Sequence, residues 1–149
     1  MGLTAGNGRL ATGLNSRIAH IVKSAPTRKG PIMADQTCTW TGASGTNYTY
    51  YVYPRGTSVN QADGNYVYAK LNGQNQWVPV YFGEGDLSKR AGSAGGDHHR
   101  KKCIDSKGAT HVHMHLNATE RARRAEEKDL LARYKNALVP EGCNVSPTG

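Results

Sequence analysis

Residues 80–90, VYFGEGDLSKR, combine side chains that are suited to phosphate chemistry. An apolar run ends in Tyr81, a glycine-rich turn follows, and a helix is predicted to begin near Asp86 and to carry Arg90 after one turn. An arginine binds phosphoryl oxygens with a fixed fork of N–H donors, and a tyrosine hydroxyl can position or deprotonate a water molecule. Because a free tyrosine hydroxyl has a pKa of about 10, it acts as a base only near a metal ion or cationic side chains.

Glu127 adds a carboxylate to these residues. Residues 121–138 contain no helix breaker, and Asn117 with Glu120 is typical of a capping box at the start of a helix. The apolar stripe of this predicted helix consists of Leu130, Leu131, Tyr134 and Leu138, and Glu127 continues it. A carboxylate on the buried side of a helix needs a partner or a metal ion. Two interpretations follow: an ordinary ion pair with Arg123, one turn earlier, or a divalent cation site.

Tyrosine-rich runs predict the strands that position these residues. Runs with strand character cover residues 48–53, 65–71, 77–82 and 110–116. The joints between the first three are rich in Gly, Asn and Asp, which favours hairpin-like antiparallel pairing, and Pro79 favours an edge position or a bulge. The tyrosines of 48–53 could stack on bases, or they could be divided between core and surface. The expected fold class is α+β: a small antiparallel sheet of three core strands, with an extra N-terminal strand, flanked by helices.

The order of these motifs resembles that of the GIY-YIG nuclease family over residues 65–144. A strand with Tyr-Val-Tyr is followed by a strand ending Tyr-Phe-Gly, a helix with an arginine, a third strand and a Glu-x-x-Leu-Leu-x-x-Tyr helix. The matching residues are Tyr68 in the GIY strand, Tyr81 in the YIG strand, Arg90, the metal-holding glutamate Glu127, and Asn144, which closes the module. The first glycine of the family name has no counterpart next to the tyrosines of the earlier strand.

The resemblance implies a metal-dependent endonuclease that hydrolyses phosphodiester bonds of nucleic acid, with DNA as the favoured substrate. Glu127 would hold a divalent ion, Mg²⁺ with Mn²⁺ as a substitute, and Arg90 would bind the scissile phosphate. Tyr68 is favoured as the proton acceptor and Tyr81 as the residue that positions water or phosphate, although the sequence leaves this choice open. The alternative function is a non-catalytic module that keeps the fold and binds nucleic acid or metal.

The histidines offer a further catalytic candidate and a rival metal site. Several relatives in the family use a histidine after the arginine, and His98 or His99 can take that place. A row of histidines also alternates with apolar residues along 110–116, and Cys103 or the His98–His99 pair could complete a zinc site with it. The members of the row are His111, His113 and His115. The competing interpretation is the polar face of a half-buried strand.

The formal net charge of +8 is unevenly distributed. Residues 1–32 carry five basic side chains and no acidic one, whereas 33–149 carry fourteen basic and eleven acidic side chains. Clusters of basic residues are consistent with a polyanionic partner, and solvated protein faces are the alternative explanation. The residues expected to contact the nucleic-acid backbone are Lys89, Arg100, Lys101, Lys102 and Arg123.

Residues 1–32 are expected to form a basic, flexible extension, and residues 33–149 the nuclease-like domain. An organelle presequence and a true start at Met33 are the other interpretations of the extension. Three widely spaced cysteines without a CxxC pair argue against a disulfide framework and fit a reducing, cytoplasmic location. No apolar run approaches the roughly 18–20 residues of a membrane-spanning helix, so no membrane partner is expected.

Overall fold

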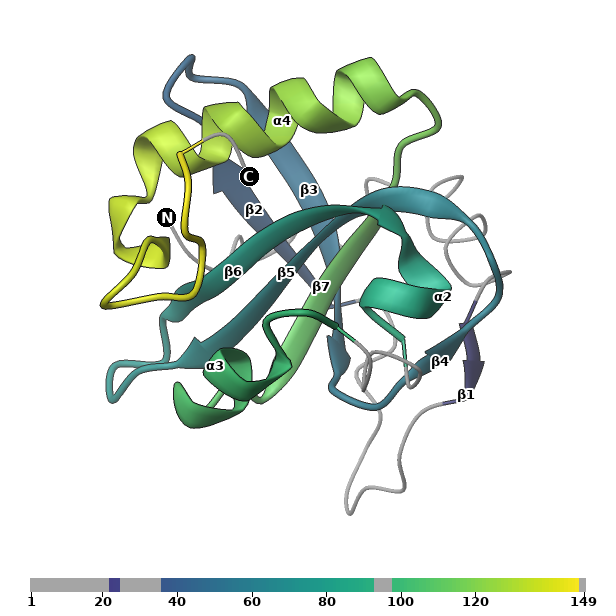
Figure 1. The fold of residues 1–149 in the computed structure, drawn as a ribbon, viewed down its shortest axis with the longest axis horizontal. Helices are drawn as coiled ribbons and strands as arrows, with labels where there is room; N and C mark the ends of the chain where they lie inside the picture. Colours follow the sequence, from purple (N-terminus) through teal and green to yellow (C-terminus); the bar gives the residue numbers. More distant parts are fainter. Residues whose placement is uncertain (1–21, 25–35, 93–97, 148–149) are drawn as a thin grey trace.

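The computed structural model describes residues 22–24, 36–92 and 98–147 (Figure 1). Most of the predicted extension 1–32 therefore lies outside the described residues. Its described part is strand β1 (Val22–Ser24), which pairs with β4 (Ser58–Val59) in a small two-stranded sheet. The extension as a separate flexible segment stays a prediction.

The described part of the chain is α+β, as expected, and it contains a five-stranded antiparallel sheet in the order β2-β3-β7-β5-β6. The strands are β2 (Thr37–Thr41), β3 (Asn47–Pro54), β5 (Asp63–Leu71), β6 (Trp77–Asp86) and β7 (His111–Leu116). The four predicted strands are confirmed as β3, β5, β6 and β7. The expectation of three core strands plus one is wrong, because the five-residue strand β2 pairs with β3 and completes the sheet.

Only one of the expected hairpins forms. β5 and β6 pair directly, whereas β7 inserts between β3 and β5 and pairs with both. The prediction for Pro79 is confirmed, since β6 is an edge strand and the β5–β6 register shifts beside this proline. Tyr68 lies opposite Tyr81, and the next residue, Ala69, lies opposite Pro79, which leaves Val80 as the extra residue of a bulge.

Helices cover both faces of the sheet (Figure 1). The long helix α4 (Glu120–Arg133) and the 3₁₀ helix η3 (Lys135–Ala137) pack on one face, and α2 (Leu87–Arg90) and α3 (Lys101–Ser106) lie on the other. The cap of α4 is Thr119, whose hydroxyl accepts from the N–H of Ala122, so the expected cap at Asn117 is wrong. Asn117 instead donates to Asn65 on β5 and to Glu126.

The two faces of the sheet carry two apolar cores. The cluster under α4 contains Trp40, Tyr50, Val67, Trp77, Phe82, Leu130, Leu131 and Tyr134. The opposite cluster contains Tyr51, Tyr66, Tyr68, Tyr81, Leu87, Ile104, Val112 and Met114. Four tyrosines thus belong to the core on the α2 side, and their hydroxyl groups bring polar chemistry to that face of the sheet.

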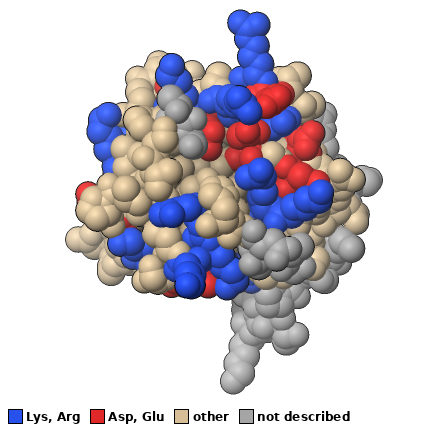
Figure 2. All heavy atoms as spheres, viewed as in Figure 1, with Lys and Arg blue, Asp and Glu red and all other residues tan. Residues whose placement is uncertain are grey.

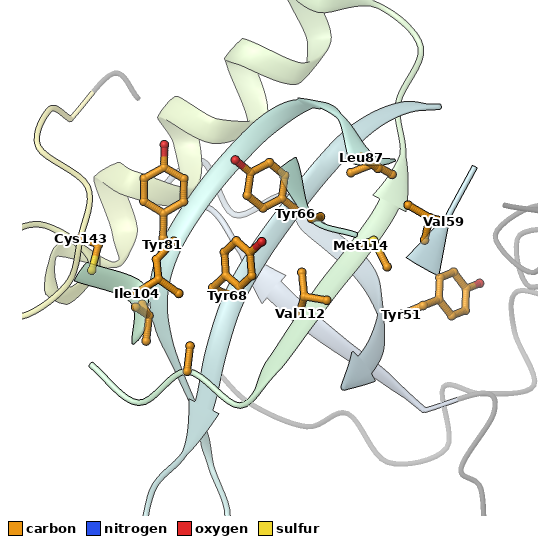
Figure 3. Packing of buried hydrophobic residues seen from close by; sticks show 13 residues of the cluster. Tyr51, Val59, Tyr66, Tyr68, Tyr81, Leu87, Ile104, Val112, Met114 and Cys143 are labelled. Atoms are coloured by element: carbon orange, nitrogen blue, oxygen red, sulfur yellow. The ribbon is translucent and has the colours of Figure 1, made fainter. Parts of the chain in front are cut away.

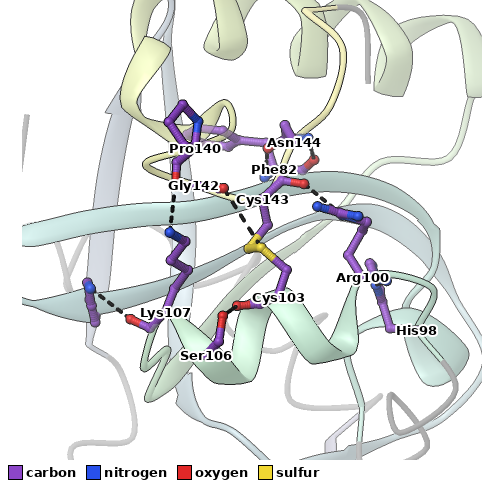
Figure 4. The surroundings of a disulfide bond; sticks show 11 residues. Phe82, His98, Arg100, Cys103, Ser106, Lys107, Pro140, Gly142, Cys143 and Asn144 are labelled. Atoms are coloured by element: carbon purple, nitrogen blue, oxygen red, sulfur yellow. Dashed lines mark hydrogen bonds between the residues drawn. A yellow bond between two sulfur atoms is a disulfide. The ribbon is translucent and has the colours of Figure 1, made fainter.

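A disulfide joins Cys103 of α3 to Cys143 in the C-terminal segment (Figure 4). The expectation that the cysteines would not form a disulfide is therefore wrong for this pair. The two residues are 40 positions apart, and they meet because the C-terminal segment returns along β6, where the N–H of Cys143 donates to the carbonyl of Val80. Cys38 is buried and takes part in no disulfide among the described residues. Among the described residues, no helix is long and apolar enough to span a membrane.

Candidate active site at the edge of the sheet

Three tyrosine rings surround His98 on the α2 side of the sheet. The ring centroids of Tyr66, Tyr68 and Tyr81 lie 5.8, 5.8 and 5.0 Å from the centroid of the His98 ring. Figure 3 shows the three tyrosines side by side on β5 and β6, with the hydroxyl groups of Tyr66 and Tyr81 at the same end. The sheet thus brings the sequence-predicted Tyr68, Tyr81 and His98 together, and it adds Tyr66.

The hydrogen bonds of His98 fix its protonation state. The backbone N–H of Arg100 donates to Nδ1 of His98 at 3.0 Å, so that nitrogen carries no proton. Nε2 therefore carries the proton and donates it to the hydroxyl oxygen of Tyr66 at 2.6 Å. Burial, followed by the charges of His99, Arg90 and other neighbouring cations, lowers the pKa of His98 to about 4, which agrees with a neutral ring.

Tyr66 is the tyrosine most completely integrated into this cluster. Its ring stacks on that of Tyr81, with centroids 6.1 Å apart, and lies directly over Gly83 on the neighbouring strand. Burial and the nearby Tyr81 and Tyr68 raise the pKa of its hydroxyl well above 10, whereas Arg90 acts in the opposite direction. The oxygen of Tyr66 thus accepts a hydrogen bond from His98, and the positive charge of Arg90 acts on it.

Tyr68, the predicted proton acceptor, is hydrogen-bonded to the backbone of α2. Its hydroxyl donates to the backbone carbonyl of Arg90 at 2.6 Å, and the guanidinium of Arg55 lies over its ring. Burial raises the pKa of this hydroxyl to about 12. Tyr68 therefore holds the end of α2 in place, and its hydroxyl proton is already used in that contact.

Arg90 lies at the end of the single turn of α2, close to strand β6. The helix begins at Asp86, whose carboxylate accepts from the N–H of Ser88. Gly85 has a φ of +133°, and a Cβ added there would lie 2.9 Å from Nε of Arg90. Burial raises the pKa of Tyr81 to about 12, and Arg90 counteracts this shift, so the guanidinium is close enough to influence both Tyr66 and Tyr81.

Glu127 is buried on α4, as the helical periodicity predicted. Only 7% of its surface is exposed, and among the described residues its carboxylate makes no hydrogen bond or ion pair. Burial and the charge of Glu84 raise its pKa to about 7, against the lowering effect of Arg124 and Arg90. The alternative ion pair with Arg123 does not form.

Arg123 instead binds Glu84 on strand β6. Its Nε donates to Oε1 of Glu84 at 2.8 Å, and its NH1 donates to the carbonyls of Asn117 and Ala118. Arg123 is 8% exposed and its Nε and Nη1 are bound within the protein, which does not favour the predicted contact with nucleic acid. Arg123 lies one turn of α4 before Glu127, so its ion pair holds Glu84 of the edge strand against the same helix that carries Glu127.

Asn144 closes the module as a backbone clamp. Its Oδ1 accepts from the N–H of Phe82 at 2.9 Å, and its Nδ2 donates to the carbonyl of the same residue at 3.0 Å. The side chain thus pairs with the edge of β6 immediately after Tyr81. This contact positions the strand that carries Tyr81, and the residue does not join the tyrosine cluster itself.

The remaining basic residues vary in their availability. Lys89 and Lys102 are exposed, and Lys101 is exposed but pairs with Asp105 at 2.6 Å. Arg100 is partly buried, and its Nε donates to the carbonyl of Cys143 at 2.9 Å. Figure 2 shows acidic side chains gathered between basic ones on this face of the molecule.

The histidines of β7 lie in the core or at its edge: His113 is buried, and His111 and His115 are partly buried. Nδ1 of His113 accepts from the indole N–H of Trp40 at 3.0 Å, and Nε2 of His115 bonds to Glu126 at 2.6 Å. His113 is fully buried, so the row is more than the polar face of a half-buried strand. Among the described residues, no group of three or more His, Cys, Asp or Glu side chains is arranged to hold a metal ion.

Two residues of the site, Tyr66 and Glu84, were missed by reasoning from the sequence. Tyr66 lies two residues before the predicted Tyr68, so the alternation along the strand was a signal that both tyrosines lie on one face of β5. Glu84 follows the Tyr-Phe-Gly motif directly, and the sequence contained no signal that it would meet α4.

Comparisons of the chain with protein-family models, with curated proteins and with solved structures find no match.

Proposed function

We propose that this protein is a metal-dependent endonuclease of the GIY-YIG type, which hydrolyses phosphodiester bonds of nucleic acid, with DNA as the favoured substrate. The observation that carries the proposal is the combination of a Tyr66–His98 hydrogen bond with Arg90 and a buried, unpaired Glu127 around one edge strand. A structural core has no need for an unpaired carboxylate, since burying one is costly. A phosphate-cleaving site, by contrast, can use a cationic group on the phosphate and a carboxylate for a metal ion.

The acidic residues fit a hard divalent cation such as Mg²⁺ or Mn²⁺. Glu127 offers a buried carboxylate without a protein partner, and oxygen ligands of this kind suit Mg²⁺, which retains several waters and takes few protein ligands. When bound, the ion would neutralise the negative charge that grows on the phosphoryl oxygens.

The side chains of this chain account for the other requirements of the reaction. Arg90 is exposed and adjacent to the tyrosines, so its guanidinium can bind the scissile phosphate and hold it in line for attack by water. Hydrolysis forms a bond between phosphorus and the water oxygen and breaks the bond to the leaving oxygen; one proton of the water passes to the general base, and the leaving oxygen takes a proton from solvent. Tyr81, stacked against Tyr66, is placed to orient the water or the phosphate.

The proton acceptor in this proposal is the oxygen of Tyr66. His98 cannot accept the proton, because Nδ1 already accepts from Arg100 and Nε2 is protonated. Burial keeps the Tyr66 hydroxyl protonated before substrate binds, since it raises its pKa, so this hydroxyl must first release its proton to solvent when substrate and metal ion bind. Nε2–H of His98 and the guanidinium of Arg90 would stabilise the resulting phenolate, which then takes a proton from the attacking water and returns to the neutral form.

The test is conversion of supercoiled plasmid to nicked and linear forms by the full chain, with Mg²⁺ or Mn²⁺ and with EDTA. Glu127→Gln and Arg90→Ala are each expected to reduce cleavage by at least about 100-fold, because each removes a charge that acts on the phosphate. Arg133→Ala, at the exposed far end of α4, is the matched control and is expected to cut as the wild type does. Wild-type cleavage in both variants contradicts the proposal. DNA binding without any metal-dependent cutting favours the non-catalytic alternative.

A further inference from the structure

We propose that Glu84 is a second carboxylate ligand of the divalent cation, and that it shares the ion with Glu127 across the gap between β6 and α4. This inference rests on the proposed function for the presence of the ion. It assigns a role to a residue outside the five that match the family motifs.

The two glutamates are brought together by the packing of α4 on the edge strand. Arg123 of α4 forms an ion pair with Glu84 of β6. Glu127 follows Arg123 by four residues, so Arg123 and Glu127 lie on the same face of α4. Glu84 is also the strongest electrostatic neighbour of Glu127. Two negative charges that act on each other in a mostly buried place repel, and a divalent cation bound by both carboxylates would remove that repulsion.

The hydrogen bonds of Glu84 leave one of its oxygens available. Oε1 accepts from Arg123 at 2.8 Å, whereas Oε2 has only the distant Nε of the exposed Arg124, at 3.8 Å. Among the described residues no donor is hydrogen-bonded to Oε2. Arg123 thus orients the carboxylate through one oxygen, an arrangement that is common for residues supporting metal ligands, and leaves the other oxygen to coordinate the ion.

The burial of Glu127 is a second observation in favour of a ligand. Its side chain is more than nine-tenths buried and has no partner among the described residues. The positive charges around it, Arg90 and Arg124, lower its pKa but do not form an ion pair with it. A cation held by Glu127 and Glu84 supplies the missing partner.

The experiment is a titration of the full chain with Mn²⁺ alone at pH 8. Binding is measured by calorimetry or from the electron spin resonance signal of free Mn²⁺. Glu84→Gln and Glu127→Gln are each expected to weaken Mn²⁺ binding by at least about tenfold. Glu141→Gln, which replaces an exposed glutamate of the C-terminal segment, is the matched control and is expected to bind within about twofold of the wild type. Wild-type affinity in Glu84→Gln, or no Mn²⁺ binding by the wild type, overturns the proposal.

Arg123→Gln separates a ligand from a merely structural role of Glu84. This variant also removes the ion pair between β6 and α4, but Glu84 keeps its carboxylate. If Glu84 is a ligand, Arg123→Gln weakens Mn²⁺ binding less than Glu84→Gln does; an equal loss means that Glu84 acts only through packing and overturns the inference. The plasmid assay remains a separate readout. Mn²⁺ binding through both glutamates without cleavage contradicts the proposed nuclease alone, and cleavage with unchanged binding in Glu84→Gln contradicts the second ligand alone.

Discussion

Gly83 lies directly opposite Tyr66 in the β5–β6 ladder, and a Cβ added to Gly83 would lie 2.3 Å from Cζ of the tyrosine and 2.4 Å from its hydroxyl oxygen. The absence of a side chain at Gly83 therefore allows the Tyr66 ring to lie across β6 toward His98. The glycine of the Tyr-Phe-Gly motif has a steric function in this fold, which is to make space for the tyrosine of the neighbouring strand.

Replacing Gly83 by Ala is expected to displace Tyr66 and break its hydrogen bond to His98. No real Cβ tolerates a contact of 2.3 Å, and overpacking of a core costs about 1–3 kcal/mol. Denaturant unfolding and the plasmid assay measure the two consequences, lower stability and loss of cleavage. Gly73→Ala is the control, because nothing lies within 4 Å of a Cβ at Gly73. Equal activity of Gly83→Ala and the wild type contradicts a role for the position of Tyr66.

Tyr66→Phe and Tyr68→Phe distinguish the two tyrosines of β5. Tyr66→Phe removes the oxygen that accepts from His98, so the cleavage rate is expected to fall by at least about 100-fold. Tyr68→Phe removes a hydrogen bond to the carbonyl of Arg90 and is expected to cost about 1 kcal/mol of stability, with a much smaller effect on cleavage. Single-turnover rates and denaturant unfolding of both variants provide the measurement. The reverse order of effects would restore Tyr68 as the proton acceptor.

The choice between these tyrosines shows where prediction from the sequence ends. Tyr66 and Tyr68 are two residues apart, so both face the same side of β5, and alternation along the strand cannot distinguish them. Their difference arises from the bulge opposite Tyr68 and from the position of His98, which is 30 residues further along the chain than Tyr68 and is held by Arg100. Both are long-range features that no local pattern encodes.

The helix and strand predictions succeeded where the periodicity was local. The burial of Glu127 followed from the spacing of Leu130, Leu131 and Tyr134 on α4. The predicted ion pair of Glu127 with Arg123 does not form, because Arg123 binds Glu84 of strand β6 instead. The pairing of β7 between β3 and β5 was likewise not predictable, since neighbouring runs in the chain do not fix which strands become neighbours in the sheet.

Glu127→Gln is expected to stabilise the metal-free protein at pH 8 and to have little effect at pH 5. The folded-state pKa of Glu127 is raised to about 7, above its ordinary value of 4.5, so the folded state binds the proton more tightly. The stability associated with this proton is present below pH 4.5 and is lost as the pH rises through about 7. At pH 8 the buried negative charge therefore costs on the order of 2–3 kcal/mol.

Thermal unfolding in EDTA at the two pH values tests this prediction. Mg²⁺ or Mn²⁺ is expected to raise the Tm of the wild type at pH 8, because a bound ion neutralises the charge, and not that of Glu127→Gln. Glu141→Gln, which replaces an exposed glutamate, controls for the general effect of removing one negative charge. A lower Tm of Glu127→Gln at pH 8 in EDTA contradicts a costly, unpaired carboxylate.

Reduction of the Cys103–Cys143 disulfide is expected to destabilise the protein by about 4 kcal/mol, because the bond closes a loop of roughly 40 residues in the unfolded chain. The same bond anchors the segment in which Cys143 accepts from Nε of Arg100 and Asn144 clamps Phe82 (Figure 4). Guanidinium unfolding with and without dithiothreitol measures the effect. The double variant Cys103→Ser/Cys143→Ser should match the reduced wild type and should not respond to dithiothreitol. Unchanged stability of the wild type after complete reduction, verified by thiol titration, contradicts a stabilising role for the bond.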